Sequence, residues 1–350
     1  MLTNMLETIQ PVDEAAYASC IARFDQVAKP VGSLGKLETL LAKIAAVSGS
    51  ADIDLAKKCV LVFCADNGVT AQNVSQSGHE VTTAIARMLI NGKSGVCVMA
   101  KACGADVFPV DVGMADTVDG ILNRKLVFGT DDITEGSAMT RETAIKAIEL
   151  GMALVKEKRE HGYRLIATGE TGIGNTTTAS AMASVLLCTP VETVTGRGAG
   201  LSDEGLLRKR AAIAKAIRVN APNAADPIDV LAKVGGLDIA TMVGAYLGGA
   251  LYRVPIVMDG VISAVAALAA VRLNMKVREY IIPSHISAEP AARLICEALK
   301  MEPILHADMR LGEGTGAVAL FPLLDMAAAV YHNAATFADI AVDAYKRQPC

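Results

Sequence analysis

The sequence predicts a doubly wound, parallel α/β sheet with a small helical domain built from both ends of the chain. Short apolar segments typical of strands alternate with helical segments from about residue 59 to 300. That alternation is the pattern of parallel strands joined by crossover helices. Residues 1–25 and 305–350 show helical patterns only. We therefore assign residues 26–304 to a large α/β domain and the two ends to the small helical domain.

The composition agrees with a buried parallel sheet. Of 350 residues, 52% are hydrophobic, yet only 4% are aromatic and tryptophan is absent. Small and aliphatic side chains suit a parallel sheet whose two faces are covered by close-packed helices. A chain of this length is sufficient for one large and one smaller domain.

Each predicted strand is followed by polar residues. The predicted strands are residues 59–65, 105–110, 165–167, 254–258 and 280–282. The polar residues that follow them include Asp66, Asp111, Glu170, Asp259 and the stretch 284–287. Because ligands of open α/β sheets bind at the carboxyl ends of the strands, these polar residues predict the position of the site.

The predicted helices are marked by caps and by apolar periodicity. Ser202 or Asp203 can cap one helix, and Asp226 followed by Pro227 has the order of a cap and a first helical residue. Helices are expected at 13–28, 36–47, 80–90, 140–161, 175–187, 317–331 and 334–345. Further helices are expected to begin at the caps just named, at 235–239 and at 287–290.

Charge and hydropathy exclude several classes of protein. The net charge is −4 and the isoelectric point about 5.8, which disfavours nucleic acid as a partner. No apolar run reaches the roughly 18 residues of a membrane span, since the best, 254–271, contains Pro255 and Asp259. The first residues lack the features of a signal peptide. We expect a cytoplasmic enzyme without a membrane partner, whose apolar surplus covers the interface of a dimer.

The cysteines indicate neither a disulfide framework nor a metal site. The eight cysteines are scattered and include no C-x-x-C pair, and no Cys/His spacing is typical of zinc. We expect no metal and no cofactor.

The segment 165–178 predicts a phosphate site. An apolar run leads into a loop with Gly169, Gly172 and Gly174, and then into a helix with Asn175 or a following threonine as its cap. Glycine loops at helix N-termini bind phosphate through backbone N–H groups and the helix dipole. The spacing matches a Walker motif, except that Asn175 replaces the lysine that reaches β- and γ-phosphates. The segment therefore predicts a monophosphate cradle, with a plain strand–helix turn as the alternative.

A second anion-binding element follows in the chain. The glycine-rich stretch 196–200 precedes a helix with Arg208, Lys209 and Arg210 in its second turn. The alternative for these three residues is a solvated, charged helix face.

Two glutamates predict acid–base chemistry. Glu170 lies in the anion loop, where a carboxylate raises the electrostatic cost and so requires a role. Glu313 lies between Gly312 and Gly314, and glycine permits a close approach of the backbone. In a largely apolar pocket Glu313 would have a raised pKa and could act as a general base. Its alternative is a cap for a helix at 315–318. Two carboxylates beside a monophosphate loop predict transfer at a phosphorylated sugar.

Five motifs carry a family resemblance. They are Lys29-Pro-x-Gly-Ser-Leu-Gly-x-Leu-Glu38, Gly169-Glu-x-Gly-Ile-Gly-Asn-Thr-Thr177, Gly235-Gly-Leu-Asp238, Pro283-Ser-His-x-Ser-Ala-Glu289 and Arg310-Leu-Gly-Glu-Gly-Thr-Gly316. In this order, over residues 24–333, they resemble the nicotinate-nucleotide:dimethylbenzimidazole phosphoribosyltransferases of the cobalamin lower-ligand pathway. Members convert nicotinate mononucleotide and an aromatic base into an α-riboside 5′-phosphate and nicotinate. The resemblance implies a Rossmann-like domain, a small helical domain from both termini, and a dimer with itself or a close paralogue.

The resemblance also implies roles for single residues. The catalytic base falls on Glu313 and the second acidic residue on Glu170. The phosphate cradle falls on Gly172, Gly174, Asn175 and Thr176, with Lys209 and Ser287 beside it. The other implied substrate-binding residues are Asp259, Leu311, Gly312, Ser77 and Met88.

One position departs from the family pattern. The resemblance implies a glutamine on the helix after the first base-binding segment, but residues 81–87 contain none and place Ile85 there. The acceptor therefore stays open among benzimidazoles, adenine and phenols. A P-loop kinase or hydrolase and a non-catalytic or acceptor-specialised paralogous subunit are the alternative functions. Asn175 disfavours the first, and the presence of Glu313, Glu170 and Lys209 disfavours the second.

Overall fold

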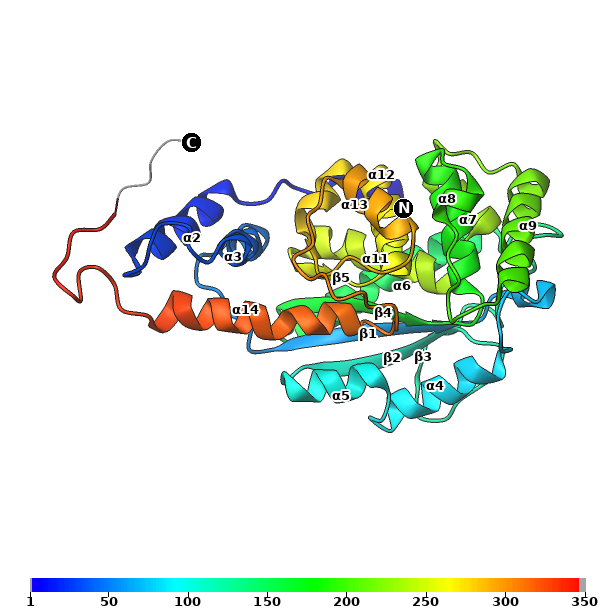
Figure 1. Cartoon of the computed structure of the whole chain (residues 1–350), viewed down its shortest axis with the longest axis horizontal. Helices are drawn as coiled ribbons and strands as arrows, with labels where there is room; N and C mark the ends of the chain where they lie inside the picture. Colours follow the sequence, from blue (N-terminus) through cyan, green and yellow to red (C-terminus); the bar gives the residue numbers. More distant parts are fainter. Residues whose placement is uncertain (1, 346–350) are drawn as a thin grey trace.

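A six-stranded, wholly parallel sheet forms the centre of the molecule (Figure 1). The structure, a computed structural model, describes residues 2–345. The strands are β1 (Lys58–Ala65), β2 (Asp106–Gly113), β3 (Leu122–Asn123), β4 (Leu165–Thr171), β5 (Ile256–Met258) and β6 (Ile281–Pro283). Their order is β3-β2-β1-β4-β5-β6. The chain runs from β1 to one edge and returns at β4 to build the other, so the predicted doubly wound sheet is confirmed.

Helices cover both faces of the sheet and continue beyond it. Those before β4 are α1 (Leu2–Glu7), α2 (Glu14–Gln26), α3 (Lys36–Ser48), α4 (Glu80–Ile90), α5 (Gly95–Ala102) and α6 (Arg141–Glu160). Those after it are α7 (Asn175–Leu187), α8 (Val191–Val194), α9 (Asp203–Asn220), α10 (Pro227–Val234), α11 (Leu237–Tyr252), α12 (Val261–Leu273), α13 (Ala291–Leu299) and α14 (Thr315–Asn333). Short 3-10 helices, η1 (Gly68–Gln72) and η2 (Met275–Tyr280), complete the set.

The core lies on both sides of the sheet because the strands are buried on both faces. Alternate residues of β1 belong to two hydrophobic clusters: Leu61 and Phe63 point to the cluster with α6 and α11, and Val60 and Val62 to the cluster with α14. The parallel register pairs Phe63 with Glu170. The ends of β1 and β4 therefore meet at the point where the strand order reverses, which is the expected position of a ligand site.

The predicted secondary structure needs correction at several places. Strand β2 extends to Gly113, so Asp111 lies in the strand and not after it. Strand β4 extends through Thr171 and does not end at residue 167, so Gly169 and Glu170 lie in the strand and not in the loop. The short strand β3 was not predicted, because two residues carry no periodicity. The predicted helix at 334–345 is wrong: after α14 the described chain forms turns, held by a bridge from Thr336 to Val27.

The ends of the chain are arranged around α14. Helices α2 and α3 pack together and lie beside the distal half of α14 at one end of the molecule (Figure 1). Helix α14 also contacts β4 and α5, and α1 packs on α11. The division into residues 26–304 and a small domain from both ends stays a prediction.

Helix α14 is also long and apolar enough to cross a membrane by length and composition, contrary to the expectation that no segment would qualify. This is weak evidence, because core helices of soluble proteins pass the same test. Half of the apolar window of this helix is buried inside the structure.

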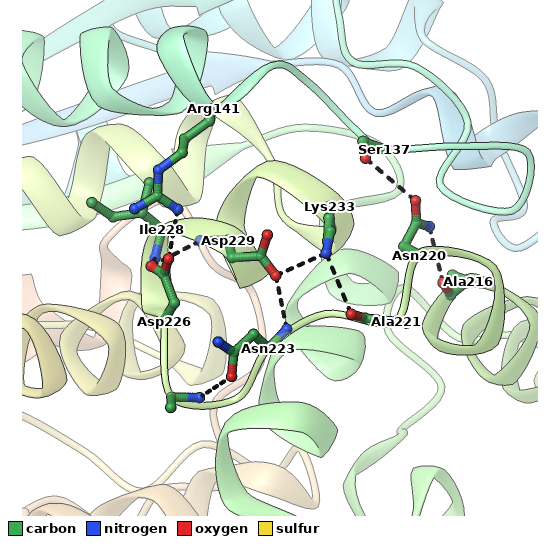
Figure 2. Close-up of polar contacts among 11 residues, drawn as sticks. Ser137, Arg141, Ala216, Asn220, Ala221, Asn223, Asp226, Ile228, Asp229 and Lys233 are labelled. Carbon is green, nitrogen blue, oxygen red and sulfur yellow. Dashed lines mark hydrogen bonds and ion pairs between the residues drawn. The ribbon is translucent and has the colours of Figure 1, made fainter.

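A polar network fixes the turn between α9 and α10 (Figure 2). The side chain of Asn220, at the end of α9, accepts a hydrogen bond from Ser137 at 3.4 Å. Arg141, at the start of α6, forms an ion pair with Asp226 at 2.7 Å. These contacts tie the C-terminal end of α9 to the loop before α6, and the start of α10 to α6 itself.

Candidate active site

A cavity of about 200 Å³ opens at the carboxyl ends of β4, β5 and β6. It is enclosed by the start of α7, the loop before α9, the β5–α12 turn and the loop before α14. Nine of the predicted site residues line it: Glu170, Gly172, Asn175, Thr176, Asp259, Ser287, Leu311, Gly312 and Glu313. Residues from four distant parts of the sequence thus form one site.

Three buried carboxylates form the acidic side of the site. Glu170, Asp238 and Asp259 are at most 7% exposed. The ion pairs formed within residues 2–345 include none of them. The Asn175 side-chain amide donates to Glu170, and to Asp238 at 3.0 Å. A buried carboxylate without a cation costs stability, so this cluster indicates a function.

The carboxyl groups differ in pKa. Burial, together with the negative charges of Asp238 and Asp259, raises the pKa of Glu170 to about 8, although the hydrogen bond from Asn175 acts in the opposite direction. Burial also raises the pKa of Asp238 to about 6. The raised pKa of Glu170 favours its protonated form at neutral pH.

Asp259 caps α14 and lies close to His285. Its two carboxylate oxygens accept hydrogen bonds from the N–H groups of Gly314 at 3.1 Å and Ala317 at 3.0 Å. Burial raises the pKa of Asp259, and the nearby His285 opposes the shift. Burial lowers the pKa of His285, while Asp259 opposes that shift. Asp259 thus connects the carboxyl end of β5 to the loop that carries Glu313.

Glu313 is held in an unusual backbone conformation. It has a φ of +60°, which L residues rarely adopt. A Cβ atom on Gly169 would lie 2.3 Å from the backbone oxygen of Glu313, so this loop can rest on β4 only where residue 169 has no side chain. Glu313 is half-buried, and its carboxylate accepts a hydrogen bond from the N–H of Val96 at 3.3 Å. It therefore contacts the N-terminus of α5, and not that of the helix at 315–318.

The opposite side of the cavity is suited to an anion. Helix α7 begins after Gly174, whose φ is +94°, and no side chain caps its N-terminus. Lys209 is 0% exposed and its Nζ donates to Thr176 Oγ1 at 2.8 Å. It makes no ion pair within the described chain. Burial lowers the pKa of Lys209 to about 8, and the charge of Glu289 opposes the shift.

Of the three basic residues in the second turn of α9, Lys209 contacts the site through Thr176 but does not itself line the cavity. Arg208 and Arg210 donate to backbone carbonyls outside the cavity. The predicted anion-binding element therefore applies to Lys209, and the alternative of a charged outer face applies to Arg208 and Arg210. Gly174 lines a smaller adjoining cavity of about 60 Å³ at the start of α7.

Three further expectations differ from the structure. The cap of α7 is Gly174 and not Asn175, whose side chain turns to the carboxylates. Ser77 and Met88 do not line the cavity, and Met88 is 43% exposed. Ile85, on the same helix as Met88, does line it.

Comparisons with known proteins agree with one another. A family model described as "Phosphoribosyltransferase" matches residues 9–342. The nicotinate-nucleotide–dimethylbenzimidazole phosphoribosyltransferase of Acetivibrio thermocellus is 46% identical over 350 residues, which cover 99% of this chain and 100% of the relative. The protein of that name from Ruminiclostridium cellulolyticum is 47% identical, covering 93% of each chain. This chain belongs to the nicotinate-nucleotide–dimethylbenzimidazole phosphoribosyltransferase family.

A solved structure extends this similarity to the fold. The crystal structure of CobT from Thermus thermophilus is 37% identical, with a TM-score of 0.88 over 94% of this chain and 99% of that one. The predicted family resemblance and the fold are both confirmed.

Two residues of the candidate site lie in stretches noted in the sequence but were not assigned a role there. Asp238 is fully buried at the start of α11, next to the cavity. His285 lines the cavity, and a Cβ atom on Gly316 would lie 2.0 Å from its ring. The sequence features that could have indicated these two residues were the two glycines before Asp238 and the polar stretch after β6. Both features also fit the ordinary start of a helix. Among residues 2–345, no three His, Cys, Asp or Glu side chains could hold a metal ion.

Proposed function

We propose that this chain transfers the 5-phosphoribosyl group of nicotinate mononucleotide to an aromatic base, giving an α-riboside 5′-phosphate and nicotinate in cobamide biosynthesis. One observation carries the proposal beyond the family name. The cavity combines groups of opposite charge: the N-terminus of α7 and Thr176 line it with Lys209 bound behind Thr176, and Glu170, Asp259 and Glu313 also line it. Nicotinate mononucleotide has a matching polarity, with an anionic phosphate and a cationic pyridinium ring.

The phosphate binds at the start of α7 in this proposal. The backbone N–H groups of Gly174 and Thr176 and the Lys209 ammonium group supply hydrogen-bond donors and positive charge. Ser287 lines the same cavity and can donate a further hydrogen bond. Because the phosphate takes no part in the bond changes, its binding energy can hold C1′ of the ribose against the carboxylates.

The carboxylates act where the charge changes. The bond from C1′ to the pyridinium nitrogen breaks, and its electron pair leaves with nicotinate, so the leaving group needs no proton. The acceptor forms the new bond to C1′ with a lone pair on its ring nitrogen or oxygen, and the proton of its N–H or O–H group passes to Glu313. Glu170 and Asp259 stabilise the positive charge on the sugar. Glu170 is the second candidate for the base.

The acceptor is an aromatic base bound beside Ile85 and Leu311. Both side chains line the cavity and present apolar surface, which suits 5,6-dimethylbenzimidazole, a related base or a phenol. No amide stands at position 85 to select a ring nitrogen. We infer that the apolar surface area of each acceptor and the acidity of its N–H or O–H proton decide which acceptor is used.

The proposal includes a cytoplasmic dimer. The cysteines of the described residues are free thiols, as is usual in reducing compartments. Met88, Val98 and Leu311 are large apolar side chains at least 43% exposed. Leu311 lies against Gly95 of α5, the helix that carries Val98, since a Cβ atom added to Gly95 would contact the Leu311 side chain. A second copy or a close paralogue covers this surface in the proposal.

Release of nicotinate tests the function. The purified chain is incubated with nicotinate mononucleotide and benzimidazoles, purines or phenols, and nicotinate and riboside phosphate are measured by chromatography. We expect acceptor-dependent release with equal amounts of both products. Absence of release with every acceptor would favour a non-catalytic subunit, and release only after addition of a paralogue would favour an acceptor-specialised one.

A further inference from the structure

Asp238 lies next to the cavity without lining it. Its side chain is 0% exposed, and no cation neutralises it among residues 2–345. A buried carboxylate that no cation neutralises is destabilising. Packing therefore does not explain the acid at this position.

Asn175 connects Asp238 to Glu170. Its Nδ2 donates to Asp238 Oδ2 at 3.0 Å and also to Glu170 Oε2. An amide nitrogen has two N–H bonds, so it can serve both acceptors at once. Asp238 is itself fixed, because its Oδ1 accepts a hydrogen bond from the N–H of Ile239 at 2.9 Å.

The connection sets the direction of the Glu170 carboxyl group. Glu170 Oε2 accepts the hydrogen bond from Asn175, so the other oxygen, Oε1, points toward Gly312 in the Glu313 loop. A Cβ atom added to Gly312 would lie 2.8 Å from Oε1. The space around Asp238 is equally defined, because a Cβ atom on Gly236 would lie 2.6 Å from its Oδ1.

We propose that Asp238 is a positioning residue of the transfer reaction: through Asn175 it directs Glu170 toward the sugar, and its negative charge keeps a proton on Glu170 until the cationic nucleotide binds. This inference rests on the proposed function. When the pyridinium ring enters, its positive charge favours the ionised carboxyl group, and Glu170 releases the proton to solvent. The reactive sugar then faces a carboxylate that was neutral in the empty cavity.

The groups facing Glu170 determine the sign of the effect. Asp238 on α11, Asp259 after β5 and Glu313 before α14 are the acids near it. Asp66 after β1 acts on Asp238, His285 on Asp259, and Glu289 on Lys209. Burial and then Asp238 raise the pKa of Glu170 most. Removing the charge of Asp238 therefore lowers the pKa of Glu170.

Asp238→Asn tests the proposal because it removes the charge and keeps the shape. Its one amide oxygen can still accept from Asn175, while the contact with the N–H of Ile239 is lost. The protonated carboxyl group of Glu170 is followed by infrared difference spectroscopy without turnover, and its band is assigned by its absence in Glu170→Gln. For the unmodified chain we expect the band to titrate near pH 8, and for Asp238→Asn we expect the midpoint to fall by about one pH unit. The rising limb of the pH profile of kcat/KM moves by the same amount.

Asp111→Asn is the matched control. Asp111 is equally buried at the end of β2, but it pairs with Lys125 at 3.3 Å and accepts from Gly113 and Met114. We expect its loss to leave the Glu170 midpoint in place.

Two results would overturn the proposal and leave Asp238 a structural role. The first is an unchanged midpoint of the infrared titration in folded Asp238→Asn. The second is a lower kcat while the rising limb of the kcat/KM profile stays at the same pH. If Asp238→Asn does not fold, the shorter Asp238→Ser carries the same expectation. Failure of the proposed function would appear separately, as an infrared shift without turnover by any chain.

Discussion

The Lys209 ammonium group donates a hydrogen bond of 2.8 Å to the hydroxyl group of Thr176, at the first turn of α7. This contact joins two segments that lie far apart in the sequence, the glycine loop after β4 and the basic turn of α9. It aims a fully buried cation without an ion pair at an uncapped helix N-terminus. Both features favour an anion between them.

Lys209→Ala should weaken binding of nicotinate mononucleotide by about 1.5–3 kcal/mol, the range for a hydrogen bond to a charged group. Calorimetric titration measures this loss. Nicotinate riboside, which lacks the phosphate, should bind the variant and the unmodified chain equally. An equal loss for riboside and nucleotide would place the action of Lys209 elsewhere.

Glu170 should give stability a pH dependence. Its pKa is raised from 4.5 to about 8 in the folded chain. Between these values the folded chain holds a proton that the unfolded chain has released, so the free energy of unfolding falls as pH rises. The contribution is fully present below pH 4.5 and is lost as pH rises toward 8.

Glu170→Gln removes this titration and should flatten the slope, by up to about 1.4 kcal/mol per pH unit. Urea unfolding of both proteins between about pH 5 and 8 measures the difference. Parallel curves for variant and unmodified chain would mean that Glu170 titrates at its ordinary pKa.

Val98→Glu tests the proposed dimer. Val98 is 60% exposed on α5, and a charge there should disfavour burial against a second chain. Sedimentation velocity should show a dimer for the unmodified chain, or for its mixture with a paralogue, and a monomer for the variant. A stable and active monomer of the unmodified chain at micromolar concentration would contradict the dimer.

The sequence contained most of the fold, because apolar strands alternate with capped helices. It missed the end of β4, where Thr168, Gly169 and Glu170 are buried in the strand. These residues carry no apolar signal, and their burial depends on distant partners: the Glu313 loop packs against Gly169, and Tyr246 and Ser263 form hydrogen bonds with Thr168.

The candidate site was predictable where a motif names its own chemistry. The glycine loop, Lys209 and Glu313 are examples. Asp238 was not, because its partners Asn175 and Glu170 come from α7 and β4, and no local pattern brings them together. Met88 shows the opposite error, since it shares a helix with the cavity residue Ile85 but points to the exposed surface.

The central claim is that Glu313 removes the proton of the acceptor during phosphoribosyl transfer. Glu313→Gln keeps the shape of the side chain and an acceptor for the N–H of Val96, but it cannot take that proton. Turnover with 5,6-dimethylbenzimidazole should fall by about 10²–10⁴-fold, with nucleotide affinity little changed.

The most direct measurement compares nicotinate release by Glu313→Gln and by the unmodified chain for a neutral benzimidazole and for an acidic phenol that is already ionised. An ionised acceptor has no proton to lose, so the account predicts that its turnover is largely spared while turnover of the neutral acceptor collapses. Equal loss for both acceptors would contradict proton removal by Glu313 and would make Glu170 the better candidate for the base.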